Sequence, residues 1–177
     1  MNLVKIIFKS PGIVKIVIKF ETMTWFIDFE GYHFEYLDFM VKEIAILSKD
    51  GSQCFNYMIK YPCSMIFNAK DIPTAQFQFK RHGLFWECGD YTFIEAIIDI
   101  KNKVGSDMVY VKGLEKSEYL KLLLSPNVKC VPEHPPFREL ENCLEKQCGV
   151  HGKHCARRKV FEICYWFEKI HKQAKTV

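Results

Sequence analysis

The sequence predicts an α/β fold in which a mixed β-sheet carries helices on both faces. Three strand-like segments follow one another at residues 24–30, 41–48 and 53–60, and the last two flank the turn dipeptide Asp50-Gly51, a strong hairpin signal. Helical and strand-like patterns then alternate, the order expected when a sheet is extended by parallel strands. The chain has 177 residues, of which 49% are hydrophobic, enough for one domain with its own core.

The first part of the chain is rich in β-branched residues. Residues 1–20 are a β-prone extension, either a hairpin turning near Pro11 or a poorly ordered leader, and the domain is assigned to residues 21–177. The first strand of the domain ends in acids. Because strand side chains alternate, Asp28 and Glu30 point to the same side of the sheet. With the two strands that follow, this strand is expected to form a three-stranded antiparallel meander.

The second part of the chain alternates between helical and strand-like patterns. Four glycine and proline residues interrupt residues 61–90, which are therefore expected to be irregular. Residues 91–103 have a broad apolar face at helical spacing and predict a helix. The remaining elements follow from the same patterns: a strand at 107–111, a helix at 115–124, a strand at 127–131, and helices at 137–147 and 154–173.

A compact group of metal-binding residue types lies before the last helix. Cys148, His151 and Cys155 have the spacing C-x2-H-x3-C, with glycines between them. In a helix, or in a turn that leads into one, this spacing brings two sulfurs and one imidazole together. Zinc binds both groups and favours four tetrahedral ligands, so the sequence predicts a structural zinc site whose fourth ligand lies elsewhere in the chain. The alternative is three unrelated residues in a chain with eight cysteines.

Charge points to a polyanionic partner. The formal net charge is +4, and basic residues crowd the last helix. This pattern favours nucleic acid, with Arg157, Arg158, Lys159 and the potentially stacking Trp86 as candidate nucleic-acid-binding residues, and Phe85 as a second aromatic candidate. A solvated surface with an excess of lysines would give the same composition.

The sequence gives no indication of a membrane partner. No apolar run has membrane-spanning length, and the N-terminus lacks the pattern of a secretory signal. The cysteines are then expected to be reduced and to serve as core residues or metal ligands. The protein is accordingly expected to be intracellular, either cytoplasmic or nuclear.

Several short motifs, taken in order, resemble those of DEDD-type 3′–5′ exonucleases of the ribonuclease H-like superfamily. The first strand, Phe26-Ile27-Asp28-Phe29-Glu30-Gly31, resembles their Asp-x-Glu motif, and His154-Cys155-Ala156-Arg157-Arg158-Lys159 resembles their His-x-Ala-x-x-Asp motif. The strand that contains Glu43, together with the Cys-His-Cys element, resembles most closely the maelstrom domain, a branch with the same fold. The resemblance extends over roughly residues 25–167.

The maelstrom resemblance implies a ribonuclease H-like fold, loss of most catalytic acids and a zinc site of Glu, Cys, His and Cys. It therefore assigns Glu43 as the fourth zinc ligand. Glu43 shares a strand face with Ala45 and Leu47, and in this fold that face would pack against the last helix. Cys143, which lies near the turn, is the alternative fourth ligand because zinc prefers thiolate to carboxylate.

The exonuclease resemblance assigns Asp28, Glu30 and His154 to catalytic positions, where Mg²⁺ ions would be held by carboxylates. The two remaining carboxylate positions fall on Lys116 and Lys159. Because an ammonium group repels a metal ion, Mg²⁺-dependent activity is expected to be weak or absent. The two acids would then be inherited surface carboxylates that pair with these lysines.

The expected function is a degenerate exonuclease-like, zinc-stabilised domain that binds nucleic acid, with single-stranded RNA as the class that the resemblance implies. One alternative is an active Mg²⁺-dependent 3′–5′ exonuclease that uses Asp28 and Glu30. Its further ligand would come from Asp107, Glu115 or Glu118. The other alternative is a protein–protein scaffold.

Overall fold

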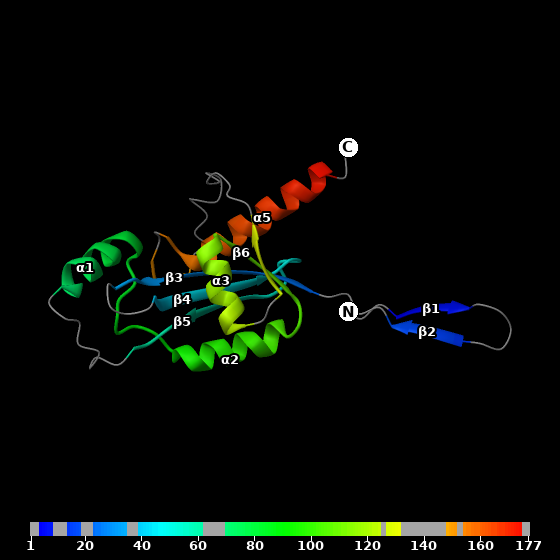
Figure 1. The fold of residues 1–177 in the computed structure, drawn as a ribbon, viewed down its shortest axis with the longest axis horizontal. Coiled ribbons are helices and arrows are strands. Elements are labelled where there is room, and N and C mark those ends of the chain that lie inside the picture. The colour runs from blue at the N-terminus through cyan, green and yellow to red at the C-terminus, as the bar shows by residue number, and fades with distance from the viewer. Residues whose placement is uncertain are drawn as a thin grey trace.

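A computed structural model of the chain describes residues 4–8, 14–18, 23–34, 39–61, 70–124, 127–131, 148–151 and 154–174. These residues form an α/β fold with a five-stranded mixed sheet and a separate two-stranded sheet (Figure 1). The predicted fold class is therefore confirmed at the level of an α/β mixed sheet. Within the described ranges, no helix is long and apolar enough to cross a membrane.

The larger sheet has the strand order β5-β4-β3-β6-β7. Strands β3 (Thr24–Tyr32), β4 (Met40–Ser48) and β5 (Cys54–Met58) pair antiparallel as the predicted meander. Strands β6 (Met108–Lys112) and β7 (Val128–Val131) extend the sheet in parallel on the other side of β3. The carboxyl ends of the three parallel strands therefore lie along one edge, where open α/β sheets commonly carry their sites.

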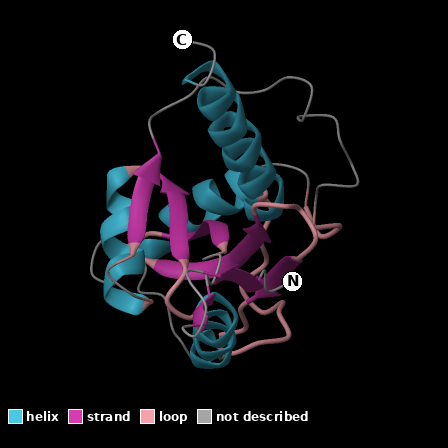
Figure 2. Ribbon diagram, turned by 90° about the vertical axis from the view of Figure 1, so that its right-hand side faces the viewer, coloured by secondary structure: helices cyan, strands magenta, loops and turns pink. Residues whose placement is uncertain are grey.

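Helices cover both faces of this sheet. α2 (Phe93–Val104) and α3 (Leu114–Leu123) pack on one face, and α5 (Ala156–Ala174) packs on the other (Figure 2). α2 begins at a capping box: the Thr92 side chain accepts the backbone N–H of Glu95, and the Glu95 carboxylate accepts the backbone N–H of Thr92. The basic helix α5 thus lies over its own face of the sheet.

Alternation along β3 decides which side chains meet which helix. The odd-numbered residues from Trp25 to Phe29 are buried in the core under α2 and α3. Phe26, between them, faces the opposite way and packs with its ring centroid 5.3 Å from that of Phe167 on α5. Asp28 and Glu30 lie on the same face as Phe26, so both carboxylates face α5.

A β-bulge changes the direction of β3 directly after Glu30. The pairing with β4 shifts between Glu30 and Gly31. At this point the two backbones approach so closely that a Cβ on Gly31 would lie 2.1 Å from the carbonyl oxygen of Met40. Only glycine fits this contact, which fixes the register of the strand beside Glu30.

Helix α1 (Asp71–His82) lies in the segment expected to be irregular, so that prediction is wrong for these residues. Pro73 is compatible with the helix because it lies in the first turn, where a backbone N–H has no helical partner. The helix buries few apolar side chains, since Ile72 and Phe77 are exposed. Gly83 ends the helix in the left-handed conformation, with φ at 73°.

The N-terminal extension contains a pair of strands. β1 (Val4–Phe8) and β2 (Val14–Ile18) pair antiparallel, which confirms the hairpin alternative. The predicted helix at 137–147, which contains Cys143, lies outside the described residues.

Candidate metal centre and the adjoining acid pair

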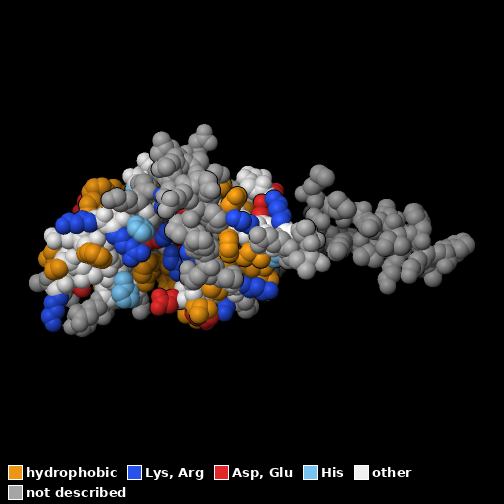
Figure 3. Space-filling view, turned by 90° about the horizontal axis from the view of Figure 1, so that it is seen from above, with side chains coloured by type: hydrophobic (Ala, Val, Ile, Leu, Met, Phe, Trp, Pro, Cys, Tyr) orange, Lys and Arg blue, Asp and Glu red, His pale blue; other side chains and the backbone are white. Residues whose placement is uncertain are grey.

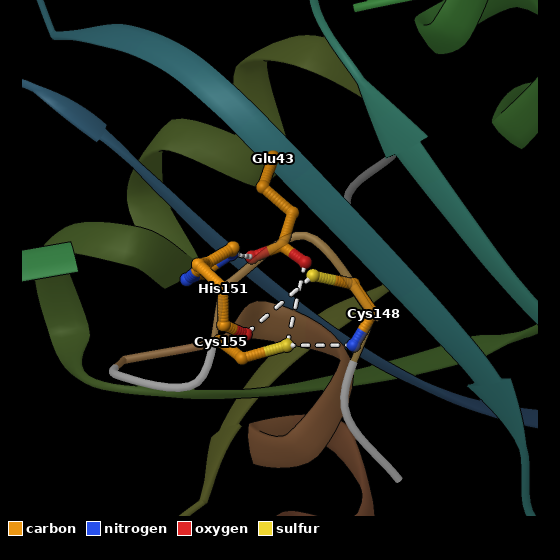
Figure 4. A group of neighbouring side chains, drawn as sticks. All are labelled: Glu43, Cys148, His151 and Cys155. Atoms are coloured by element: carbon orange, nitrogen blue, oxygen red, sulfur yellow. Dashed lines mark hydrogen bonds and ion pairs between the residues drawn. The ribbon is translucent and has the colours of Figure 1, made fainter. Parts of the chain in front are cut away.

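Four side chains from two distant parts of the chain meet between β4 and the start of α5. Glu43 lies on β4 and, like Ala45, faces α5 as expected. Cys148 and His151 belong to the turn before α5, and Cys155 immediately precedes the helix. One ligand atom from each of the four residues lies within 4.8 Å of those of the others (Figure 4).

The Glu43 carboxylate accepts most of the hydrogen bonds within this group. Its Oε2 accepts the backbone N–H of Ala156 at 2.7 Å and lies 3.0 Å from His151 Nε2. Its Oε1 accepts the Cys155 thiol at 3.5 Å, and the Cys155 sulfur accepts the backbone N–H of Cys148 at 3.3 Å. The carboxylate thus lies at the N-terminus of α5, where the helix dipole favours negative charge.

Burial makes the charges of this group depend on one another. Glu43 and Cys155 are each 0% exposed, and burial raises the pKa of Glu43. Burial acts to lower the pKa of His151, but its hydrogen bonds to Cys148 and Glu43 outweigh burial and raise that pKa to about 10. The hydrogen bond from Cys155 lowers the pKa of the Cys148 thiol. A positive charge among these sulfur and oxygen atoms is therefore favourable, and a metal ion would supply one.

The donor set is two cysteine sulfurs, one imidazole nitrogen and one carboxylate oxygen, and it can hold a metal ion such as zinc. The residues are those predicted: Glu43, Cys148, His151 and Cys155. Four protein ligands leave a tetrahedral ion without an open position for water, which is typical of structural rather than catalytic sites. Cys143, the alternative ligand, lies outside the described residues.

A second charged group adjoins the metal ligands. Glu30 on β3 is the register partner of Glu43 on β4. Like charges directly opposite one another on a sheet face are destabilising, so each carboxylate needs its own compensation. Glu30 pairs with Lys159, which follows Ala156, the residue bound to Glu43, by one helical turn. The start of α5 therefore compensates both carboxylates.

Lysines hold both acids of β3. Lys116, near the start of α3, donates to Asp28 Oδ1 and to the Phe29 carbonyl, both at 2.6 Å. Lys159 pairs with Glu30 and lies 3.9 Å from Asp28 Oδ2. The expected ion pairs are confirmed. The expectation of surface carboxylates is wrong, because the side chains of Asp28 and Glu30 are only 2% and 10% exposed under α5.

The lysine charges determine the protonation of Glu30. Burial acts to raise the pKa of its carboxyl, but Lys159 and Lys116 together outweigh burial and hold the pKa below its usual value. Burial likewise acts to lower the pKa of Lys159, and the charges of Asp28 and Glu30 raise it above its usual value. Glu30 and Lys159 are therefore both ionised at neutral pH, and an ammonium group occupies the space beside the acids.

Three further basic residues predicted to have functional roles lie on α5 and in the turn before it. His154 is half-buried, has φ at 46°, and makes no hydrogen bond to Asp28 or Glu30 within the described part of the chain. Burial and the charge of Lys159 lower its pKa. Arg157 and Arg158 are half-buried on α5, where Arg158 Nε lies 3.3 Å from a carboxylate oxygen of Glu162.

Trp86 is packed among other aromatic rings. Its ring stacks on Tyr61 with centroids 4.9 Å apart and meets Tyr32 and Phe34 edge-on. The neighbouring Phe85 is 58% exposed. Of the two aromatic candidates for base stacking, Phe85 therefore offers the larger free surface.

Sequence reasoning missed three basic or titratable side chains near these groups. Arg81, from α1, lies close enough to Glu30 for its charge to affect the pKa of that carboxyl. His82 is 1% exposed, and burial lowers its pKa to about 4, so its ring is neutral. Lys42 is fully buried in β4 and donates to the carbonyl oxygens of Ile59, Trp86 and Cys88. None of these contacts has a local sequence signal.

Comparison with known proteins gives no family for this chain. A scan of protein-family models finds no match, and a search of curated proteins finds none either. The chemistry of the site is therefore inferred from its side chains and their contacts.

Proposed function

We propose that this chain is a zinc-stabilised, ribonuclease H-like domain of the maelstrom type that binds nucleic acid, RNA being the expected class, without cleaving it. The observation that carries this proposal is the pairing of two lysines, Lys116 and Lys159, with the buried acids Asp28 and Glu30. An antiparallel meander extended by two parallel strands supports the ribonuclease H-like assignment.

Zinc is the metal that best suits the group on β4 and at the start of α5. Mg²⁺ and Ca²⁺ prefer oxygen ligands, whereas two thiolates with one imidazole and one carboxylate suit tetrahedral zinc. The ion would join β4 to the N-terminus of α5, two elements far apart in the sequence. It would therefore contribute folding free energy directly.

The acid pair is poorly suited to metal-dependent cleavage. Two-metal phosphodiester cleavage needs carboxylates around two ions about 3.5–4 Å apart. Two of the three possible substitute acids are engaged elsewhere: Asp107 accepts the indole N–H of Trp25, and Glu118 pairs with Lys121. An active exonuclease is therefore less well supported than a binding domain.

Positive charge near the acid pair supports a polyanionic ligand. In Figure 3, Lys and Arg side chains, with His side chains beside them, gather on the half of the face nearer α1. Arg81, Lys116 and Lys159 all line a cavity beside the acids, so three positively charged side chains lie near two carboxylates. Phosphates bind such groups without sequence preference, and exposed aromatic rings add stacking on bases.

Salt-dependent binding of a labelled single-stranded RNA, measured by fluorescence anisotropy, tests this proposal. We expect the logarithm of the association constant to fall linearly with the logarithm of the salt concentration. Arg157→Gln should reduce the slope by about 0.7, as for one lost phosphate contact on a single strand. The control Lys101→Gln, on α2 at the opposite face of the sheet, should leave it unchanged. Absence of binding at low salt would overturn the nucleic-acid assignment and favour a protein–protein scaffold.

A further inference from the structure

A cavity of about 310 Å³ lies beside the acid pair, between the end of β3 and α1. Its walls come from β3 and the residues that follow it, from one side of α1, and from Lys116 and Lys159. Small-ligand sites have volumes from about 300 Å³ upward. The cavity therefore has room for a small ligand or for the end of a longer one.

The cavity carries one cation more than its acids require. Lys116 and Lys159 are paired with Asp28 and Glu30. Arg81 also lines the cavity, but within the described residues no hydrogen bond or ion pair engages its guanidinium. A guanidinium presents a planar fork of donors that binds phosphate oxygens in pairs. The unmatched charge is thus of a kind suited to phosphate.

Arg81 projects from a helix that is fixed to the sheet. Gln78, one turn earlier, accepts the backbone N–H of His33 at 2.6 Å and donates to the carbonyl of the same residue at 2.7 Å. The Tyr32 hydroxyl donates to the Leu84 carbonyl at 2.5 Å, just beyond the end of α1. These contacts hold α1 against the end of β3, so the position of Arg81 is set before any ligand binds.

His82 adds a buried donor to the wall of the cavity. Its Nδ1 accepts the backbone N–H of Leu84 at 3.1 Å, so the neutral ring carries its proton on Nε2. Nε2 has no well-aligned acceptor among the described residues, and the Gly31 backbone acts on it as a poorly aligned hydrogen-bond partner that raises the pKa of His82 against the effect of burial. Buried donors are normally paired, and a ligand oxygen would satisfy this one.

Phe77 provides an aromatic surface at the same place. It lines the cavity, is 68% exposed, and precedes Arg81 by four residues, so both side chains lie on one face of α1. An exposed ring next to a phosphate-binding group is suited to stacking on a base.

We infer that this cavity binds a phosphomonoester, either the terminal phosphate of a nucleic-acid strand or a free mononucleotide, with Arg81 as the main phosphate ligand and Phe77 against the base. A phosphomonoester carries about −1.5 to −2 charge at pH 7, whereas an internal phosphodiester carries one negative charge. The cavity, with its one cation in excess, should therefore attract a phosphomonoester more strongly than an internal phosphodiester. This inference rests on the proposed function and narrows its ligand from any stretch of the strand to the strand end.

The test compares three forms of the same single-stranded RNA that differ only in their end groups. Internally labelled strands with a 3′-phosphate, with a 5′-phosphate, or with hydroxyls at both ends are titrated with the protein and followed by fluorescence anisotropy. Adenosine monophosphate and inorganic phosphate serve as competitors. Arg81→Gln removes the proposed ligand, and Lys80→Gln, at an exposed neighbouring position of α1, removes the same charge as a control.

We expect one phosphorylated end to bind about tenfold more tightly than the hydroxyl end, the order of one charge-assisted hydrogen bond. Arg81→Gln should abolish this preference, and Lys80→Gln should retain it. Binding that ignores the end group, or a preference that survives Arg81→Gln, would overturn the inference while leaving nucleic-acid binding intact. If no RNA binds but adenosine monophosphate raises the melting temperature in an Arg81-dependent way, the cavity assignment holds and the proposed function fails. If neither ligand binds, both fail.

Discussion

Replacing Lys159 with Met should destabilise the fold by leaving the Glu30 carboxylate without its nearest cation. Met keeps most of the apolar stem, so the change isolates the charge. Removing one partner of a buried ion pair costs about 3–5 kcal/mol. Two features reduce this cost here: the Lys159 side chain is 26% exposed, and Lys116 remains 3.9 Å from Glu30. We therefore expect the free energy of unfolding to fall by about 2 kcal/mol at pH 7.

The loss should depend on pH in a defined direction. Burial acts to raise the pKa of Glu30, but the lysines hold it below its usual value in the folded protein. The ionised carboxylate therefore stabilises the fold above about pH 4.5, and this contribution disappears as the pH falls through the lowered pKa. Without Lys159, the effect of burial on the Glu30 pKa is less compensated by positive charge. The pKa therefore rises, and Glu30 takes up its proton at a higher pH. The difference between the two proteins should be largest near neutral pH and should shrink as the pH falls toward the lowered pKa of Glu30.

Denaturant unfolding followed by circular dichroism at pH 7 and pH 4 measures this effect. Lys121→Met is the matched control: Lys121 pairs with Glu118 on α3, and because the two side chains are 39% and 69% exposed, its loss should cost under about 0.5 kcal/mol. In a Glu30→Gln background, Lys159→Met should cost less than in the native chain, because only Asp28 then loses a cation and it keeps its pair with Lys116. A loss below about 0.5 kcal/mol at pH 7, or the same loss at both pH values, would refute the role of Lys159 as counter-ion.

Three further outcomes are expected. Protein prepared without chelator should contain about one zinc per chain, and Cys148→Ser and Cys155→Ser should each lower the melting temperature; metal analysis that finds no zinc would refute this. Zinc affinity should fall more in Glu43→Gln than in Cys143→Ser, and the opposite order would identify the fourth ligand as the thiolate. Asp28→Ala should change little in nuclease assays, because ammonium groups already occupy the acid site; a Mg²⁺-dependent ladder that disappears in this variant would show an active site.

The metal ligands illustrate what can be predicted from the sequence. Cys148, His151 and Cys155 are close in sequence, so their spacing alone brings them together. Glu43 lies more than a hundred residues away, and its assignment needed strand alternation together with a family resemblance. The structure places its carboxylate 3.0 Å from His151 Nε2 and on the N–H of Ala156. Alternation gave the correct face because β4 packs against α5.

The acid pair illustrates the limit of such prediction. The resemblance to exonuclease motifs predicted that Lys116 and Lys159 would pair with Asp28 and Glu30, and these ion pairs are present. The burial of Asp28 and Glu30 was not predicted, because it depends on α5 covering β3 from far along the chain.

The roles of Lys42, Arg81 and His82 were not predicted for the same reason: they depend on contacts between residues far apart in the sequence. Lys42 is buried in an apolar strand, and its carbonyl partners lie 17 to 46 residues away in the sequence. Helix α1 has two exposed large apolar residues, Ile72 and Phe77, and a proline in its first turn, so its sequence pattern resembles that of a loop. Arg81 and His82 belong to this helix, and their proximity to the acids could not be expected without it.

One measurement tests most directly whether this domain binds nucleic acid without cleaving it. A 5′-labelled single-stranded RNA is incubated with zinc-loaded protein and Mg²⁺, and the products are separated on native and denaturing gels. We predict a complex on the native gel that weakens with salt, and full-length RNA on the denaturing gel. Progressive Mg²⁺-dependent shortening from the 3′ end, abolished by Glu30→Gln, would contradict the claim that Lys116 and Lys159 silence the acid site.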